Sequence, residues 1–232
     1  MRWLVILLIL SLAGCATKMG KDGRTQTTVD AKYLVKSDVD RIADADRAEV
    51  VAGLLLIAGK LYKRNPKEWK KGGAVSREAA VERLRQRNYR NWPEFGGMRE
   101  RQAAALAFSN TYDGDRVAAL IYGLLTMVDA AFEYKEEFYI LDSLNETKLY
   151  NSARNMEIAV WKLSNDRNAA GDLFLLSNEL DPANRNISFE REFGRITGLL
   201  DFMARIVADR NGRTISRTAQ AIATMVFLPV SF

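Results

Sequence analysis

The sequence predicts an all-α protein, folded as a single compact domain of about six to eight helices over residues 37–232. Two stretches show the clearest helical periodicity, because their apolar residues recur at steps of four and three over Leu149–Leu163 and Phe189–Val207. Helix-capping residues stand before most of the periodic stretches. Apolar residues make up 48% of the chain, which is enough to bury a sizeable core among such helices.

The first fourteen residues have the pattern of a secretory signal peptide. Arg2 supplies a positive charge, the apolar run Trp3–Leu10 follows, and small residues precede the only cysteine, Cys15. The apolar run is too short for a membrane span, which needs ~20 apolar residues. We therefore expect residues 1–14 to be a signal peptide that is removed on export.

The tetrapeptide Leu12-Ala13-Gly14-Cys15 resembles the lipobox that signal peptidase II cleaves in bacterial lipoproteins. The resemblance implies that Cys15 becomes the first residue, carries acyl chains such as palmitate, and anchors the protein in the bacterial cell envelope. Ala16, where some lipoproteins have Asp, implies sorting to the outer membrane on its periplasmic side. The alternative is an unmodified, buried cysteine that follows a chance apolar run.

Residues 15–36 are expected to form a lipid-anchored flexible tether. They are mostly polar, include Gly20, Gly23 and the threonine-rich stretch Thr25–Thr28, and show no hydrophobic period. A flexible chain of some twenty residues has an r.m.s. span of roughly 25 Å. The folded domain can therefore stand off the membrane without leaving it.

The first helix of the domain is predicted to begin after Ser37 and to end near residue 64. Ser37 is an N-cap residue, and Asp40 lies three positions later, as in a capping box. The dipeptide Asn65-Pro66 ends the helix. Because Val50–Ala58 is apolar on nearly every side, we expect this helix to be central in the fold.

A basic helix is predicted after a loop that contains Trp69 and two glycines. Ser76 is its expected N-cap, and Ala80 and Leu84 mark its inner side. The following loop, Trp92–Gly97, holds two large aromatic residues. Such residues either form a binding surface or seat the loop on the core, and we favour the second interpretation.

The next two helices are predicted over Met98–Phe108 and Val117–Phe132. The second has apolar residues on nearly all its faces, so we expect it to be almost wholly buried. Asp129 is the exception. A carboxylate there acts either as an acid of raised pKa or, as we expect, as the partner of an arginine or as a cap.

Asn145 is expected to cap the helix that carries the first apolar stripe, and Ser188 the helix that carries the second. In the second helix, Gly194 and Gly198 lie four residues apart and would permit close contact with a neighbour. Between the two helices, Leu173–Leu176 is predicted as a short helix, with a strand as the alternative.

A last apolar helix is predicted over about Thr214–Phe227. Two predicted helices close at Asn65-Pro66 and Asp181-Pro182, which resembles the close of a tetratricopeptide unit. The two sites lie 116 residues apart (181 minus 65), which is no multiple of that repeat of about 34 residues. We therefore expect a non-repetitive domain.

The composition excludes several kinds of site. The chain has no histidine, so Ser-His-Asp catalysis, Cys-His catalysis and histidine-ligated zinc are impossible. The single cysteine leaves no thiol for a disulfide within the chain. No glycine-rich phosphate loop, paired-cysteine metal spacing or serine-nucleophile elbow is present. No cofactor and no metal site are predicted.

Positive charge gathers in one stretch, Lys60–Arg101. It holds thirteen Lys and Arg residues against five Glu, a balance of +8, whereas the rest of the chain after residue 14 has a balance of −4. In an envelope, the expected anions are lipid head groups or the cell wall and not nucleic acid; a solvated helix face is the other interpretation. The candidate contact residues are Lys60, Lys63, Arg64, Lys67, Lys70 and Lys71.

Three functions are consistent with these features. The first is a membrane-anchored, non-catalytic lipoprotein that binds or scaffolds another envelope component, including an envelope protein that the sequence does not identify. The second is a cell-wall glycan or peptide hydrolase that uses two carboxyl groups at fixed separation, or one strong acid, out of Glu94, Asp113, Asp115, Asp129, Glu136 and Glu137. The third is a carrier of an apolar ligand between Val50–Ala58 and Val117–Phe132. We favour the first.

Overall fold

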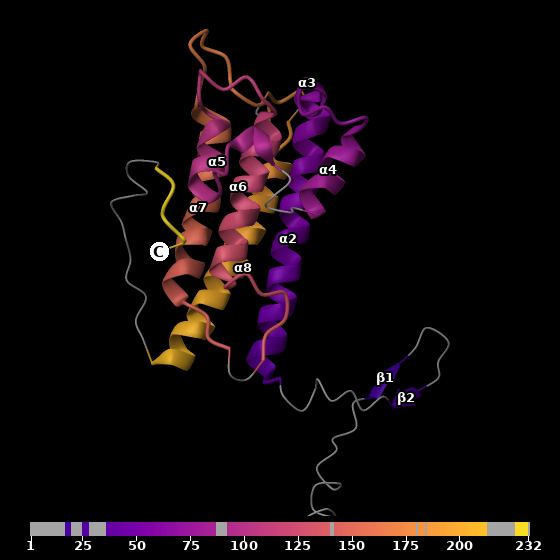
Figure 1. The fold of residues 1–232 in the computed structure, drawn as a ribbon, viewed down its shortest axis with the longest axis vertical. Coiled ribbons are helices and arrows are strands. Elements are labelled where there is room, and N and C mark those ends of the chain that lie inside the picture. The colour runs from indigo at the N-terminus through magenta and orange to yellow at the C-terminus, as the bar shows by residue number, and fades with distance from the viewer. Residues whose placement is uncertain are drawn as a thin grey trace, which may run out of the picture.

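The protein folds as an elongated bundle of helices (Figure 1), which confirms the predicted all-α class. The computed structural model describes residues 17–19, 25–27, 36–86, 92–139, 142–179, 181–183, 185–212 and 226–231. This part of the chain contains seven α-helices, within the predicted range. They are α2 (Asp38–Arg64), α3 (Pro66–Lys71), α4 (Arg77–Gln86), α5 (Glu100–Leu106), α6 (Arg116–Ala131), α7 (Glu146–Asn165) and α8 (Ser188–Asn211), joined by one 3-10 helix, η3 (Pro93–Phe95).

Two short strands lie in the segment for which we expected only a flexible tether. Strand β1 (Thr17–Met19) pairs antiparallel with β2 (Thr25–Thr27), with Thr17 opposite Thr27. The threonine-rich composition explains the pairing, because β-branched residues favour extended backbone. The ladder is three residues long on each side and does not change the fold class.

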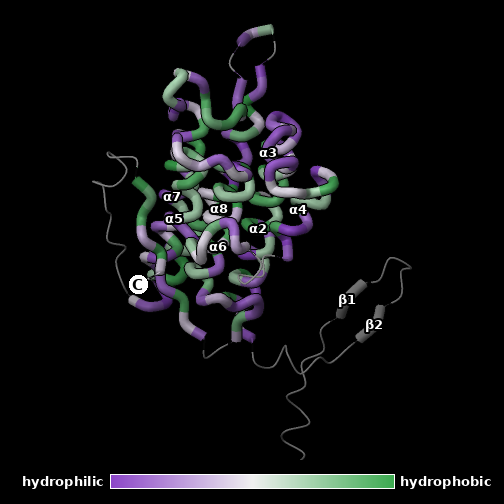
Figure 2. The backbone as a smooth tube through the Cα atoms, turned by 45° about the horizontal axis from the view of Figure 1, so that its top comes forward, coloured by the Kyte–Doolittle hydropathy of each residue, from purple (hydrophilic) through white to green (hydrophobic). Residues whose placement is uncertain are grey.

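Helix α6 lies at the centre of the bundle. Every residue from Val117 to Ala131 is buried, as predicted, and α6 packs against α2, α5 and α7. Figure 2 shows hydrophobic segments through the middle of the bundle and many hydrophilic ones in the turns at its ends. The apolar stripes of α7 and α8 face this same core, since Leu149, Leu163 and Leu200 are each at most 1% exposed.

Helix α2 begins and ends where the sequence predicts. The Asp40 amide donates to Ser37 Oγ over 3.3 Å, and Asp40 Oδ2 accepts the Ser37 N–H over 2.7 Å, which completes the capping box. Asn65 caps the other end of α2, and Pro66 occupies the first turn of α3. Trp69, which we predicted to lie in a loop, therefore belongs to a short helix.

The prediction of a helix at Leu173–Leu176 is wrong, because this segment has no regular secondary structure. Its backbone is instead held by a side chain: Asn65 Oδ1 accepts the Leu176 N–H over 2.8 Å, and Asn65 Nδ2 donates to the Leu176 carbonyl over 2.9 Å. The sequence carries no local signal for this contact, since the partners are 111 residues apart.

Close helix contacts occur at Gly53 and Gly123 but not at the two glycines for which we predicted them in α8. Gly194 and Gly198 are exposed, and a Cβ atom on either would meet nothing within 4 Å. In contrast, a Cβ on Gly123 of α6 would lie 2.4 Å from the Ala104 nitrogen of α5, and one on Gly53 of α2 would lie 2.9 Å from Ile196 Cδ1 of α8. Glycine at these two positions lets the helices approach.

The sequence predicts the N-cap of α7 correctly but places the N-cap of α8 one residue too late. Asn145 caps α7 as predicted, accepting from the Thr147 and Lys148 amides. Ser188 is not the cap of α8 but its first helical residue, because Asn186 Oδ1 accepts the Ser188 N–H over 3.0 Å and the helix starts one residue earlier. The predicted last helix lies mainly outside the described residues, and its final residues, Val226 and Phe227, are not helical.

The aromatic residues of the Trp92–Gly97 loop seat the loop on the core, as predicted. Trp92 and Phe95 are 4% and 0% exposed, and their rings stack at 5.3 Å between centroids. Both rings also contact Tyr122 of α6. No helix of the described residues has the length and apolar character that crossing a bilayer requires.

Candidate functional site

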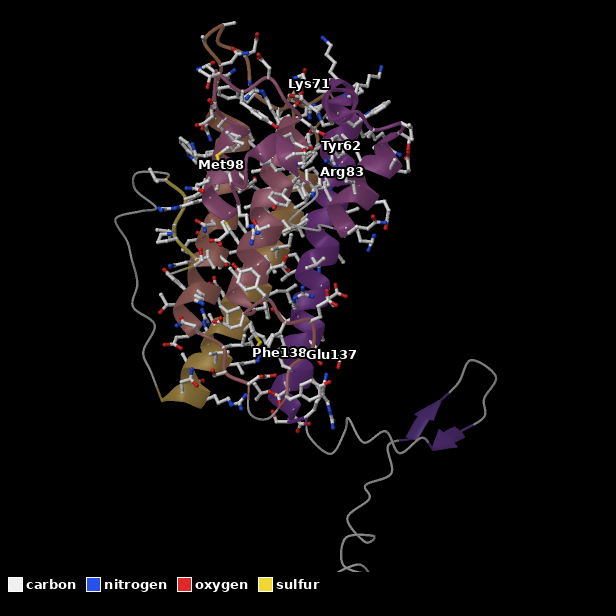
Figure 3. All side chains as sticks on the ribbon, viewed as in Figure 1. Tyr62, Lys71, Arg83, Met98, Glu137 and Phe138 are labelled. Carbon is white, nitrogen blue, oxygen red and sulfur yellow. The ribbon has the colours of Figure 1, made fainter. Side chains whose placement is uncertain are left out.

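The basic stretch predicted from the sequence lies at the end of the bundle that α3 covers. Helix α2 runs to Arg64, α3 lies across its end, and α4 returns alongside α2 with Ala80 and Leu84 buried, as expected. In Figure 3, Lys71 marks this end, whereas Glu137 and Phe138 mark the opposite one. We call these the α3 end and the tether end of the bundle.

Two buried carboxylates support the α3 end from within. Asp115 is the N-cap of α6: it accepts the Ala118 N–H over 2.8 Å and the Tyr62 hydroxyl over 2.8 Å. Glu68 of α3 accepts the Arg116 N–H over 2.7 Å. Both acids therefore satisfy backbone amides at the first turn of α6, where four amides lack partners within the helix. Burial raises the pKa of Asp115 and that of Tyr62.

Three of the six candidate cations are engaged inside the protein. Lys60 Nζ donates to the Ser188 carbonyl over 2.9 Å and lies 5.1 Å from the centre of the Phe189 ring; burial lowers the pKa of Lys60. Arg64 pairs with Glu179 at 3.7 Å, and Lys71 with Glu68 at 2.8 Å. Lys60 and Arg64 join α2 to segments beside it, and Lys71 pairs within α3, so all three have a structural role.

The other three candidates, Lys63, Lys67 and Lys70, face solvent. Within the described part of the chain, no carboxylate pairs with any of them. Lys70 Nζ lies 5.4 Å from the centre of the Trp69 ring, which leaves its charge at the surface. The α3 end therefore presents three lysines whose charge the domain does not neutralise.

A shallow groove of about 460 Å³ adjoins these lysines, between α2 and α4. Its floor is apolar, and Leu56 in it is 52% exposed. Two ion pairs along α4, Arg77 with Glu78 and Arg85 with Glu82, line its edge. The groove lining consists of Leu55, Leu56, Gly59, Lys60, Lys63, Arg77, Glu78, Val81, Glu82 and Arg85.

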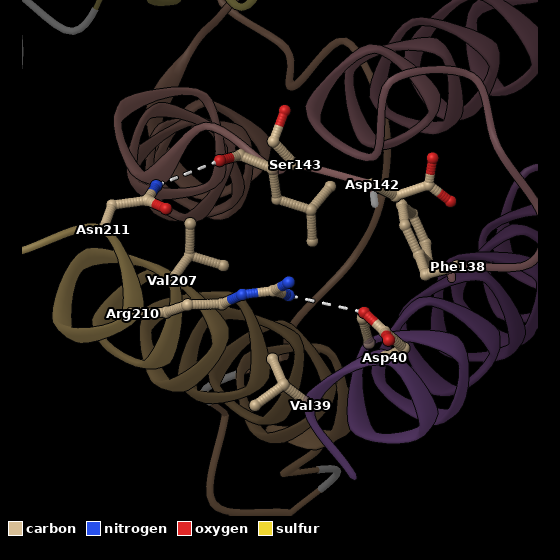
Figure 4. A pocket seen from close by; sticks show the side chains of 10 residues that line it. Val39, Asp40, Phe138, Asp142, Ser143, Val207, Arg210 and Asn211 are labelled. Atoms are coloured by element: carbon tan, nitrogen blue, oxygen red, sulfur yellow. Dashed lines mark hydrogen bonds and ion pairs between the residues drawn. The ribbon is translucent and has the colours of Figure 1, made fainter. Parts of the chain in front are cut away.

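A second cavity, of about 290 Å³, lies at the tether end between α2, α8 and the segment before α7 (Figure 4). Its charged side chains are paired: Arg210 lies 3.4 Å from Asp40, and Asp142 pairs with Lys135. Asn211 donates to the Leu144 carbonyl over 3.4 Å. Each charged residue that lines this cavity therefore already has a partner of opposite charge within the protein.

The six carboxylates considered for catalysis do not form one cluster. Asp115 caps α6, and Asp129 pairs with Arg47 at 2.9 Å, the outcome that we expected for it. Glu94 pairs with Arg83 at 2.7 Å, close to the Trp92 ring. Asp113 and Glu136 are exposed. Glu137 accepts the Tyr139 hydroxyl at the tether end.

The two segments considered for an apolar cavity pack against each other. Leu54 and Ile57 of α2, and Leu120 and Leu124 of α6, are 0% exposed within one core cluster. Among the described residues, no group of three or more acidic, cysteine or histidine side chains is placed to hold a metal ion. Leu12, Ala13, Gly14 and Cys15 of the predicted lipobox lie outside the described residues.

The sequence did not indicate the buried pair of Glu68 and Asp115. Asp115 lies immediately before an apolar helix, which is the position of an N-cap, and that signal was available. Glu68 carried none, because its acceptor role depends on α3 lying across the start of α6.

Comparison of the chain with models of protein families, with curated proteins and with solved structures gives no match. Functional inference for this chain therefore rests on its own residues.

Proposed function

We propose that the protein is a membrane-anchored lipoprotein of the bacterial envelope, lipidated at Cys15, whose helical domain is a non-catalytic binding or scaffold module. The domain would bind an anionic surface, either lipid head groups or cell wall, through its α3 end. The observation that carries this proposal is the exposure of Lys63, Lys67 and Lys70 without a carboxylate partner in the described part of the chain.

The arrangement of the acids supports this assignment. Asp115 and Glu68, which lie at the same end of the bundle as the lysines, turn inward to the amides of α6. Each Lys or Arg near an anionic leaflet contributes ~1 kcal/mol, screened over a Debye length. Three such residues would orient a tethered domain without binding it irreversibly.

The anchor is tested by replacing Cys15 with Ala. Stable anchoring needs two acyl chains, because one chain binds a membrane only marginally. We expect Cys15→Ala to abolish incorporation of labelled palmitate and to release the protein from the membrane fraction. Label that persists in the Cys15→Ala protein would place the lipid elsewhere. Density-gradient fractions that contain the wild-type protein in the inner membrane would contradict its sorting to the outer membrane.

The surface is tested with a soluble chain that begins at residue 31. Among the described residues, the hydrophobic core lies between Ala43 and Val230, so this chain retains all of that core. We expect it to sediment with phosphatidylglycerol vesicles or with cell-wall sacculi at low salt, to lose that binding as salt rises, and to ignore phosphatidylcholine vesicles. A chain that ignores both anionic surfaces would refute the proposed binding.

A further inference from the structure

The connection between α3 and α4 exposes an apolar side chain among the cations of the α3 end. Val75 is 90% exposed, more than any other large hydrophobic residue in the described part of the chain. It follows Gly72, Gly73 and Ala74, and it precedes Ser76, the residue before α4. A single exposed valine is ordinary, so the argument depends on how this one is held and what surrounds it.

The backbone on the α3 side of Val75 is fixed by a Schellman motif. The Gly73 N–H donates to the Lys70 carbonyl over 3.1 Å, and the Ala74 N–H donates to the Trp69 carbonyl over 3.1 Å. Gly73 has φ +71°, in the left-handed region that this motif requires. Ala74 and Trp69 pack against the core, as the corresponding residues of such motifs commonly do.

The α4 side is fixed by a cap. Ser76 Oγ accepts the Ala79 N–H over 3.1 Å, and the Ser76 carbonyl accepts the Ala80 N–H over 3.1 Å. Val75 thus stands just before an N-cap, where an apolar residue often packs on the fourth helical residue. That residue here is Ala80, which is 4% exposed and faces the core. Val75 does not fold back onto it and remains an ordered apolar tip.

Cations flank the tip on both sides. Lys70 and Lys71 precede it, and Arg77 follows it by two residues. Lys71 pairs with Glu68 and Arg77 with Glu78, but the side chains of both cations are about two fifths exposed. The pair of Arg77 with Glu78 is exposed and therefore weakly held, so Arg77 can turn toward an outside anion, whereas Lys71 is held by the buried Glu68. An apolar tip with exposed cations before and after it in the chain is complementary to a leaflet that has anionic head groups above acyl chains.

We propose that Val75 is a membrane-insertion residue: it enters the head-group region of an anionic phospholipid leaflet while Lys70 and Arg77 contact the lipid phosphates. This inference rests on the proposed function and refines it, because it commits the anionic surface to lipid and names the residue that penetrates. One valine buries little area, so the contact is reversible and orients the domain beside its lipid anchor.

The tip can reach the membrane that holds the anchor. Helix α2 has 27 residues, so it places the α3 end about 40 Å from the tether end. The 21 residues from Ala16 to Lys36 (36 minus 15) span at most about 70 Å when fully extended. The segment therefore covers this separation when the three-residue ladder of β1 and β2 opens.

The first test places a probe at the tip. The soluble chain that begins at residue 31 has no cysteine, because Cys15 is the only one in the sequence. Val75→Cys therefore creates a single thiol for a polarity-sensitive fluorophore. With phosphatidylglycerol vesicles we expect a blue shift, at least a twofold gain in intensity, and protection from aqueous iodide. The matched control is Ser143→Cys, at an exposed position of the tether end, which should show none of these changes.

The second test separates the tip from the groove. We expect Val75→Asp to weaken vesicle binding several-fold at fixed salt and Leu56→Asp, which changes an exposed residue of the groove, to leave it unchanged. The inference is wrong if the labelled Val75→Cys chain binds vesicles without a spectral change, or if Leu56→Asp alone removes binding. Binding to sacculi but not to vesicles would overturn the inference and leave the proposed function standing, whereas binding to neither would refute both.

Discussion

The two ends of the bundle treat their charges in opposite ways. At the tether end, Lys36 lies 2.5 Å from Asp44, Lys135 pairs with Asp142, and Arg210 lies 3.4 Å from Asp40. At the α3 end, Lys63, Lys67 and Lys70 stand at the surface without a carboxylate partner in the described part of the chain. These cations of the tether end pair within the protein, whereas these lysines of the α3 end present their charge to the outside.

The difference comes from what the acids of the α3 end are bonded to. Glu68 and Asp115 lie in the same region as the lysines, but they accept backbone amides from the first turn of α6. That helix is buried from Val117 to Ala131, so the amides of its first turn need acceptors from the protein. Glu68 and Asp115 therefore bond to the amides of the buried helix α6 and do not pair with Lys63, Lys67 or Lys70.

The first prediction compares the loss of one buried carboxylate at the α3 end with the loss of one ion pair at the tether end. Asp115→Ala should lower the free energy of unfolding by about 2–3 kcal/mol, because it removes an N-cap and leaves the buried Tyr62 hydroxyl without its acceptor. Arg210→Met should cost about 1 kcal/mol or less, because the Arg210 side chain is 37% exposed and Asp40 keeps its bonds to Ser37.

Urea unfolding of the two variants, followed by circular dichroism, provides the measurement. Asp115→Asn serves as the control, since its amide oxygen can still accept one of the two hydrogen bonds and should retain part of the stability. If Asp115→Ala and Arg210→Met lowered the free energy of unfolding equally, the carboxylates at the two ends would contribute equally to stability, and our account of the difference would be wrong.

The second prediction concerns the middle of α2, between the two ends. Asp46 is 5% exposed, its Oδ2 atom has no hydrogen-bond partner, and burial raises its pKa to about 6. An unfolded Asp titrates near 4. Between pH ~4 and ~6 the native state therefore binds more protons than the unfolded state, so this residue lowers stability progressively as pH rises and lowers it fully above pH ~6.

Asp46→Asn removes this titration. We expect the variant to be more stable than the wild type by about 1–3 kcal/mol at pH 8 and to differ little from it at pH 4. Thermal or urea unfolding at the two pH values measures the difference in the free energy of unfolding between variant and wild type. The other carboxyl groups are the same in both proteins, so their contributions cancel in this difference. A variant that is less stable than the wild type at pH 8 would mean that the ionised Asp46 has a partner that stabilises it.

Local signals predicted the fold well, and long-range contacts limited the prediction of the site. The capping box of Ser37 and Asp40 and the buried character of α6 follow from neighbouring residues alone. Gly194 and Gly198 were misread, because a small residue does not indicate whether a neighbour is present; both lie on an exposed face of α8. The contact of Asn65 with Leu176 joins segments that no periodicity relates.

The candidate site shows the same limit. Charge counting identified the basic stretch, but it treated Lys60, Arg64 and Lys71 as equivalent to the exposed lysines. Their partners, Ser188 and Glu179 among them, come from distant segments or from the next turn. Only the arrangement of the helices separates the cations that hold the domain together from those that face outward.

The most direct measurement compares two charge-reversal variants of the soluble chain that begins at residue 31. One carries Lys63→Glu, Lys67→Glu and Lys70→Glu at the α3 end. The control carries Arg185→Glu, Arg191→Glu and Arg205→Glu at other exposed positions. Both change the net charge by −6 (three residues, each from +1 to −1), so only the place of the charge differs between them.

Both variants are first checked for native circular dichroism and are then sedimented with phosphatidylglycerol vesicles and with sacculi across a salt series. We predict that the α3-end variant loses binding by at least tenfold at low salt, whereas the control variant binds within about twofold of the wild type. Equal losses in the two variants would show that net charge alone drives the binding. Undiminished binding of the α3-end variant would contradict the claim that the exposed lysines of this end form the contact surface.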